Sequence, residues 1–98
     1  MARLFKIDDE FHADLLDGDF PSFEAALAQV RRLAALPWNS EPNQALCINW
    51  QDCGRLYQIV EYDTAGPYWT EIKETPVVEI SRQGVIWREG FDPADDMR

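Results

Sequence analysis

The sequence predicts an α+β fold in which one amphipathic helix, at about residues 22–36, packs on an antiparallel meander sheet of four to five strands. Two patterns support this prediction. Apolar side chains recur at helical spacing over residues 23–34, and the later segments are short runs of β-branched and aromatic residues separated by turn residues. The length of 98 residues and the hydrophobic fraction of 46% predict a single domain over residues 1–98, with a frayed acidic tail at 92–98.

The helix is predicted from a single apolar stripe along one of its faces. The members of this stripe are Phe23, Ala26, Leu27, Val30, Leu33 and Ala34. Ser22 or Asp19 is expected to cap the first turn, and Pro37 is expected to end the helix. Because a helix of about fifteen residues is only marginally stable alone, we expect its apolar stripe to lie on a sheet.

The strands are predicted from short apolar runs between turn residues. Residues 4–7 form the first, whereas residues 11–16 are ambiguous between a helical turn and irregular structure. Residues 45–50 and 56–62 are expected to pair as a hairpin. Further strands are predicted at 68–73, 77–81 and 85–88, with Glu74-Thr75-Pro76 separating the first two.

Two registers are open for the last hairpin, which turns around Gln83-Gly84. A two-residue loop places Ile80 opposite Trp87, whereas a three-residue loop with a bulge places Ile80 opposite Ile86 and sends Trp87 to the other face. We favour the two-residue loop because it collects four apolar side chains on one face. These are Val78, Ile80, Val85 and Trp87.

One helix is too small to cover a five-stranded sheet, so part of the other face or an edge is expected to meet water or a partner. The chain is rich in Trp and Tyr, and strand alternation sends neighbouring aromatic residues to opposite faces. Some aromatic side chains are therefore expected on the uncovered face, where they are typical of interfaces. The candidate partner-binding residues are Trp38, Tyr62, Trp69, Asp8, Asp9 and Glu10.

The formal net charge of −9 restricts the classes of partner. Acidic residues concentrate near both ends of the chain, and such a surface repels nucleic-acid phosphates and anionic membranes. It suits a basic protein partner or simply solubility. The sequence contains no apolar run that approaches the roughly 20 residues of a membrane-spanning helix, and no secretion signal, so a cytoplasmic location is expected.

Candidate catalytic and metal-ligating residues are few. His12, the one histidine, lies in a dense acidic segment, for which a solvated surface is the favoured interpretation. Cys47 and Cys53 are expected to be reduced thiols, and Cys53, in a turn, is the more reactive candidate and a conceivable partner for His12. The acids at positions 14, 17 and 19 match a calcium-binding loop only loosely. No catalytic residue, cofactor or metal site is predicted.

These observations favour a non-enzymatic protein-binding or regulatory module that engages a protein partner, for which a basic surface would suit, or a second copy of itself. One alternative is a small-molecule-binding protein or minor enzyme that uses Cys53 and His12. Another is a structural homodimer that pairs its edge strands. Architecture alone assigns none of these functions.

Overall fold

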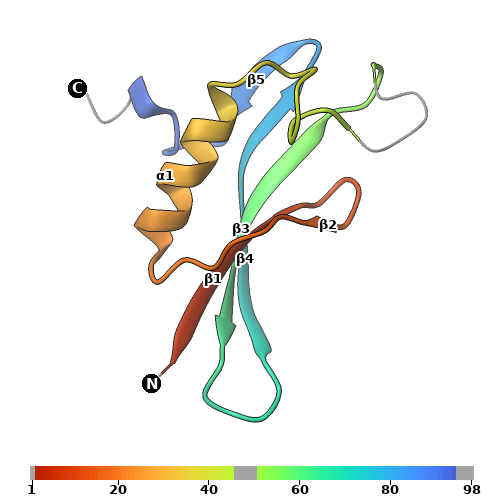
Figure 1. Cartoon of the computed structure of the whole chain (residues 1–98). Coiled ribbons are helices and arrows are strands. Elements are labelled where there is room, and N and C mark those ends of the chain that lie inside the picture. Colours follow the sequence, from red (N-terminus) through yellow and green to blue (C-terminus); the bar gives the residue numbers. More distant parts are fainter. Residues whose placement is uncertain (1, 46–50, 95–98) are drawn as a thin grey trace.

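The computed structural model describes residues 2–45 and 51–94 and confirms the predicted α+β fold. One helix packs on a five-stranded antiparallel open sheet (Figure 1). The elements in chain order are β1 (Arg3–Asp9), β2 (Asp14–Leu15), α1 (Phe23–Ala34), β3 (Arg55–Asp63), β4 (Thr70–Ser81) and β5 (Gly84–Trp87). Within the described ranges, no helix combines the length and apolar character needed to cross a membrane.

The strands lie in the order β2-β1-β3-β4-β5, which is a meander only in its second half. β2 folds back along the outer edge of β1, and α1 then carries the chain across to the other edge of β1, where β3 pairs. Of the strand predicted at 45–50, residues 46–50 lie outside the described residues, and Ala45 is not in a strand. β1 pairs with the edge of β3 at which residues 45–50 were expected, and β4 pairs with the other edge, in agreement with the predicted meander.

The observed helix agrees with the predicted one. The Ser22 side chain caps it by accepting a hydrogen bond from the Ala25 backbone N–H at 3.1 Å. Glu24 in the first turn, and Arg31 and Arg32 in the last, suit the helix dipole.

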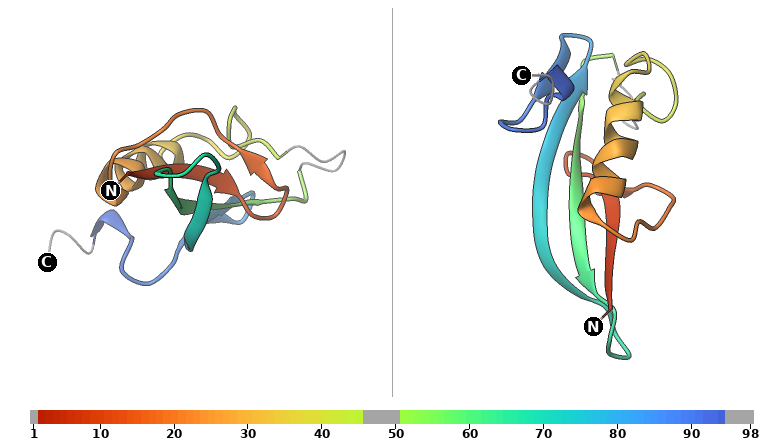
Figure 2. Two further views of the ribbon diagram at one scale, coloured as in Figure 1. Left: turned by 90° about the horizontal axis from the view of Figure 1, so that it is seen from below. Right: turned by 90° about the vertical axis from the view of Figure 1, so that its left-hand side faces the viewer.

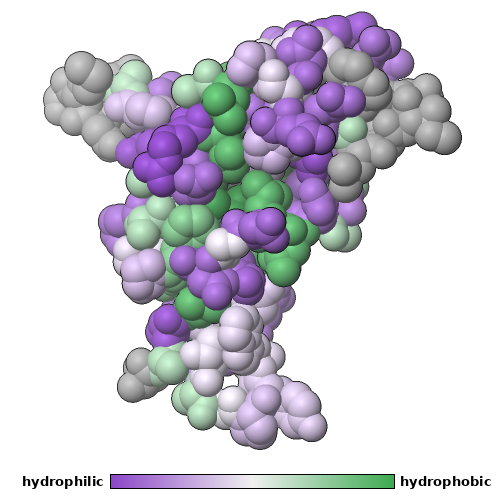
Figure 3. All heavy atoms as spheres, viewed as in Figure 1, coloured by the Kyte–Doolittle hydropathy of each residue, from purple (hydrophilic) through white to green (hydrophobic). Residues whose placement is uncertain are grey.

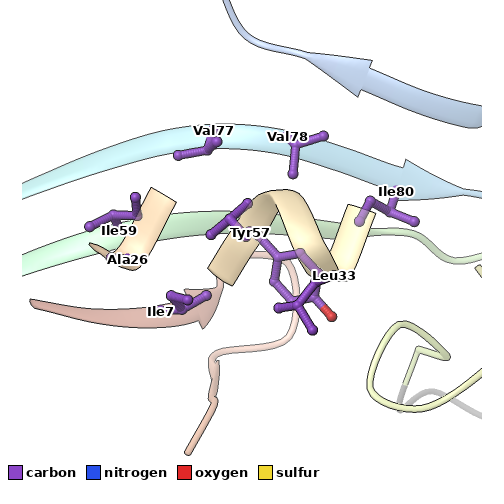
Figure 4. Packing of buried hydrophobic residues seen from close by; sticks show 9 residues of the cluster. Ile7, Ala26, Leu33, Tyr57, Ile59, Val77, Val78 and Ile80 are labelled. Carbon is purple, nitrogen blue, oxygen red and sulfur yellow. The ribbon is translucent and has the colours of Figure 1, made fainter. Parts of the chain in front are cut away.

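The apolar stripe of α1 buries Ala26, Val30 and Leu33 against the three central strands (Figure 4). The strand residues that meet the helix in this core are Ile7, Tyr57, Ile59, Val77, Val78 and Ile80. They come from β1, β3 and β4, so the core forms only when residues far apart in the sequence pair.

β4 is a single strand through the predicted break at residues 74–76, so that prediction is wrong. Pro76 pairs with Gln58, and a register shift between Tyr57 and Gln58 accommodates an extra residue at Val77. Proline lacks a backbone N–H and is tolerated at bulges and free strand edges. Because β5 pairs only with Val78–Ser81, Pro76 lies where no described strand needs its N–H.

The last hairpin has a two-residue loop, but it consists of Arg82 and Gln83 rather than Gln83 and Gly84. Ser81 therefore pairs with Gly84, Ile80 with Val85 and Val78 with Trp87. The predicted Ile80–Trp87 pairing is thus wrong, whereas the set of apolar side chains expected on one face is correct. Gly84 has φ +121°, a conformation that favours glycine and explains the position of the turn.

The segment after β5 lies on the same side of the sheet as α1 (Figure 2). The Arg88 N–H donates to the Val77 carbonyl at 2.8 Å, and Phe91 packs against the core. Of the tail predicted at 92–98, residues 92–94 are described and residues 95–98 lie outside the described range.

We predict that Leu33→Ala lowers the free energy of unfolding by about 2–5 kcal/mol, because it leaves a cavity between α1 and the sheet. Urea unfolding measures the change. Leu36→Ala is the matched control: Leu36 follows the same helix but is 44% exposed, so its loss should change the stability by no more than about 0.5 kcal/mol. Equal effects of the two substitutions would contradict the observed packing.

Candidate functional site

The sheet has one face that no described helix or strand covers, which we call the open face. Residues directly opposite each other in antiparallel strands point to the same side, so the register defines this face. Ile7, Tyr57 and Ile59 contact α1, and their strand neighbours therefore point away from it. The side chains that point to this face are those of Leu4, Lys6, Asp8, Leu56, Gln58, Val60, Tyr62, Glu71, Glu74, Pro76 and Glu79. Leu56, Gln58 and Val60 are buried among their neighbours, whereas Glu71 and Glu74 are exposed.

An aromatic pair lies on the open face where β3 ends. The rings of Tyr62 and Trp69 lie 5.9 Å apart at an angle of 50°, and the Lys6 ammonium lies 5.6 Å from the centre of the Trp69 ring. Lys6 also forms an ion pair with Asp19. Trp69 remains 51% exposed, so a large aromatic surface is held in place and accessible.

Three carboxylates of the open face lie beside this pair: Asp8, Glu71 and Glu74. Burial raises the pKa of Asp8, and the charge of Glu74 adds to the increase. The pKa of Glu74 is raised by a hydrogen bond with Glu71 and by the charge of Glu71. Burial also raises the pKa of Tyr62, and Glu71 is its largest electrostatic contributor. The open face therefore concentrates negative charge around the aromatic pair.

Two buried acceptor atoms on this face have no hydrogen-bond partner among the described residues. They are Oδ1 of Asp8 and Oε1 of Gln58, from residues that lie directly opposite each other on β1 and β3. A buried acceptor left without a donor costs about 1–3 kcal/mol of stability. The structure thus tolerates an unfavourable arrangement at this point.

Asp9 is part of the interior, although the sequence suggested it as a partner-binding residue. It is fully buried, because consecutive strand residues point to opposite sides and Asp8 faces outward. The backbone N–H groups of Phe11 and Leu56 donate to its Oδ1 at 3.1 and 2.9 Å. The same alternation was readable in the sequence and would have separated Asp8 from Asp9. Glu10 is exposed in the turn after β1.

Arg55 and His12 complete a buried polar cluster around Asp9. His12 Nδ1 lies 2.6 Å from Oδ2 of Asp9, and Arg55 Nη1 lies 3.3 Å from the same oxygen and 2.9 Å from Oδ2 of Asp14. Ala13, which lies between His12 and Asp14 in the sequence, has φ 52°, a conformation that is strained for alanine. The contacts of His12 and Asp14 therefore stabilise a strained turn. The described residues place no hydroxyl or thiol in hydrogen-bond contact with His12. We therefore interpret this cluster as structural: it stabilises the packing of the β1–β2 turn against β3.

The prediction that both cysteines are reduced is wrong, because Cys53 is disulfide-bonded. Cys47, the chain's other cysteine, lies outside the described residues. A disulfide sulfur is not the thiolate that nucleophilic catalysis requires, so the pairing of Cys53 with His12 loses its nucleophile.

The remaining candidates lie away from the open face or have other partners. Trp38 is partly buried and packs on the helix-side core. Of the acids considered as calcium ligands, Asp14 pairs with Arg55 and Asp19 with Lys6. Over residues 2–45 and 51–94, no three metal-ligating side chains are grouped closely enough to hold an ion. The structure thus brings Tyr62, Trp69 and Asp8 together and leaves Trp38 and Asp9 elsewhere.

Comparison with known proteins adds no further information: no family model, no curated protein and no solved structure matches the chain. The function must therefore be inferred from the geometry of the chain itself.

We predict that Asp9→Ala lowers the free energy of unfolding by about 3–5 kcal/mol, because it breaks the buried Asp9–Arg55 pair and leaves the backbone N–H of Leu56 without its acceptor. Thermal and urea unfolding measure the loss. Asp17→Ala, which removes an exposed acid from the following segment, should change the stability by no more than about 0.5 kcal/mol. An Asp9→Ala protein as stable as the Asp17→Ala control would contradict the role of this cluster in stabilising the β1–β2 turn against β3.

We also predict that Asp8→Asn is more stable than the wild-type protein at pH 7. Because the pKa of Asp8 is raised above 3.8 on folding, its ionised form disfavours the folded state at neutral pH. The difference should shrink as the pH falls and vanish below 3.8, where Asp8 is protonated in both states. Urea unfolding of both proteins across this range tests the prediction. A difference that does not depend on pH would contradict it.

Proposed function

We propose that this protein is a non-enzymatic binding module that engages a basic segment of a protein partner through its open face. One observation carries the proposal: the exposed Tyr62–Trp69 pair lies beside the carboxylates of Asp8, Glu71 and Glu74. Aromatic surface supplies contact area, and a Lys or Arg side chain is attracted both to an aromatic ring face and to carboxylates. This combination suits a cationic side chain inserted from a partner.

The environment of the open-face carboxylates gives further support to this proposal. Oδ1 of Asp8 and Oε1 of Gln58 are buried, so a Lys ammonium or Arg guanidinium of a partner would pair with the exposed carboxylates of Glu71 and Glu74. A bound cation would also favour the ionised forms of Asp8 and Glu74, whose pKa values are raised chiefly by burial at Asp8 and by the hydrogen bond and charge of Glu71 at Glu74. Features that lower the stability of the free chain would thus be compensated in the complex.

The charge of the whole chain agrees with a basic partner. A net charge of −9 accelerates association with cationic surfaces and opposes binding to nucleic-acid phosphates and anionic lipids. Self-association through the open face would bring like charges together, which opposes it.

The cytoplasmic location stays a prediction, and the disulfide at Cys53 is more typical of an oxidising compartment.

A second candidate, a homodimer through a strand edge, is favoured by β4. Among the described strands β5 pairs only with Val78–Ser81, which leaves the edge of residues 70–76 available. Antiparallel pairing of two copies about Ile72 would place Glu71 opposite Lys73 on both sides. The native mass of the purified chain distinguishes this candidate, because the open-face proposal requires no dimer.

The proposed function predicts that reversing two open-face charges abolishes partner binding. The tagged wild-type chain should retain a second protein from an extract of its own cells, and the double variant Glu71→Lys, Glu74→Lys should lose it. Raising the salt concentration should weaken retention by the wild-type chain, since exposed charges are screened.

The control is the charge-matched double variant Asp17→Lys, Glu41→Lys, which alters exposed acids outside the open face. It should retain the same protein as the wild-type chain. Equal loss in both double variants would indicate a general charge effect, and retention by the Glu71→Lys, Glu74→Lys protein would contradict the proposal.

A further inference from the structure

A separate cavity lies on the helix side of the sheet. It has a volume of about 370 Å³ and lies between the first turn of α1, the sheet and the segment after β5. Figure 3 shows apolar side chains gathered on this side, between α1 and the strands. The cavity is lined by Phe5, Phe23, Phe91, Ile59, Thr75, Glu61 and Lys73.

Three phenyl rings form the apolar wall. The Phe23 ring lies 6.4 Å from the Phe5 ring, nearly perpendicular to it, and 6.0 Å from the Phe91 ring. Phe91 is held in place because Arg31 donates two hydrogen bonds to its carbonyl, at 3.2 Å from Nε and 3.0 Å from Nη2. The wall is therefore built from three different parts of the chain and anchored on α1.

The polar rim of the cavity contains an ammonium group, that of Lys73, which pairs with no described carboxylate. Arg3 forms ion pairs with Glu61 and Asp63, each at 3.3 Å, and so offsets one of these two negative charges. Lys73 lies opposite Glu61 on β4, is exposed and forms no ion pair with any described residue. With Lys73 counted, the formal charges of Arg3, Glu61, Asp63 and Lys73 balance, in a chain whose net charge is −9.

We propose that this cavity binds a small apolar carboxylate, such as an arylalkanoic acid. The hydrocarbon part packs among Phe5, Phe23 and Phe91, and the carboxylate accepts hydrogen bonds from the Lys73 ammonium and the Thr75 hydroxyl. The volume lies at the lower end of the roughly 300–1,000 Å³ of ligand sites, and the mix of apolar lining and few polar groups is typical of them. This inference does not depend on the function proposed for the open face.

Titration of the isotopically labelled chain with phenylpropionate, followed by NMR, tests the proposal. We expect saturable shifts at residues of the cavity, with a dissociation constant on the order of 1 mM, and no comparable shifts on the open face. The uncharged analogue phenylpropionamide should bind about tenfold more weakly, because it lacks the charge that pairs with Lys73.

Lys73→Gln should remove the preference for the acid over the amide and leave binding of the amide unchanged. Lys6→Gln is the matched control, since Lys6 is the chain's other lysine and lies on the open face. It should keep the preference. The absence of localised shifts in the wild-type chain, equal affinities for acid and amide, or a preference that survives in Lys73→Gln would each overturn the proposal.

Discussion

The architecture depends on a mismatch of size between one helix and the sheet that it stabilises. α1 has 12 residues and is therefore about 18 Å long, whereas β4, also of 12 residues, extends over about 40 Å. The helix buries one end of one face and nothing more. The molecule is accordingly flat, with extents of 40, 39 and 18 Å. The open face remains because α1 packs on one side of the sheet only, and the cavity lies beside the first turn of α1, where the short helix begins.

Alternation along β1 distributes neighbouring acids between two unlike environments. Asp9 points inward, where Arg55, His12 and two backbone N–H groups satisfy its carboxylate. Asp8 points outward, where burial and Glu74 raise its pKa and one oxygen has no partner. The first arrangement is that of a structural cluster, in which both oxygens of the Asp9 carboxylate have partners, although Nε of Arg55 has none among the described residues. The second lies beside the exposed Trp69, Glu71 and Glu74, which is why we propose the open face as the binding surface.

The sequence was sufficient to predict the elements whose signals are local. The apolar stripe and cap of α1, and the apolar face of the last hairpin, depend on residues within one turn or one loop of each other. The pairing of β3 with β1 was not predicted, because it joins segments about 50 residues apart. A continuous β4 was missed because Pro76 is tolerated only through a bulge that forms after pairing.

Part of the candidate site was predictable because its signals are also local in the sequence. The sequence identified Tyr62, Trp69 and Asp8, and the expectation that some aromatics would lie on an uncovered face pointed to them. It did not identify Glu71, Glu74 or Gln58, since their place beside Tyr62 and Asp8 depends on strand register. The cavity was equally inaccessible, because its wall joins β1, α1 and the segment after β5.

Carboxylate footprinting tests most directly whether the open face is a docking surface. The tagged chain would be treated with a carbodiimide and a labelled amine, once purified and once in an extract of its own cells. We expect Glu71 and Glu74, which are exposed in the free chain, to be protected in the extract, while exposed Glu41 and Asp17 react equally in both samples. Equal labelling of all four residues, or protection confined to Glu41 and Asp17, would contradict the account.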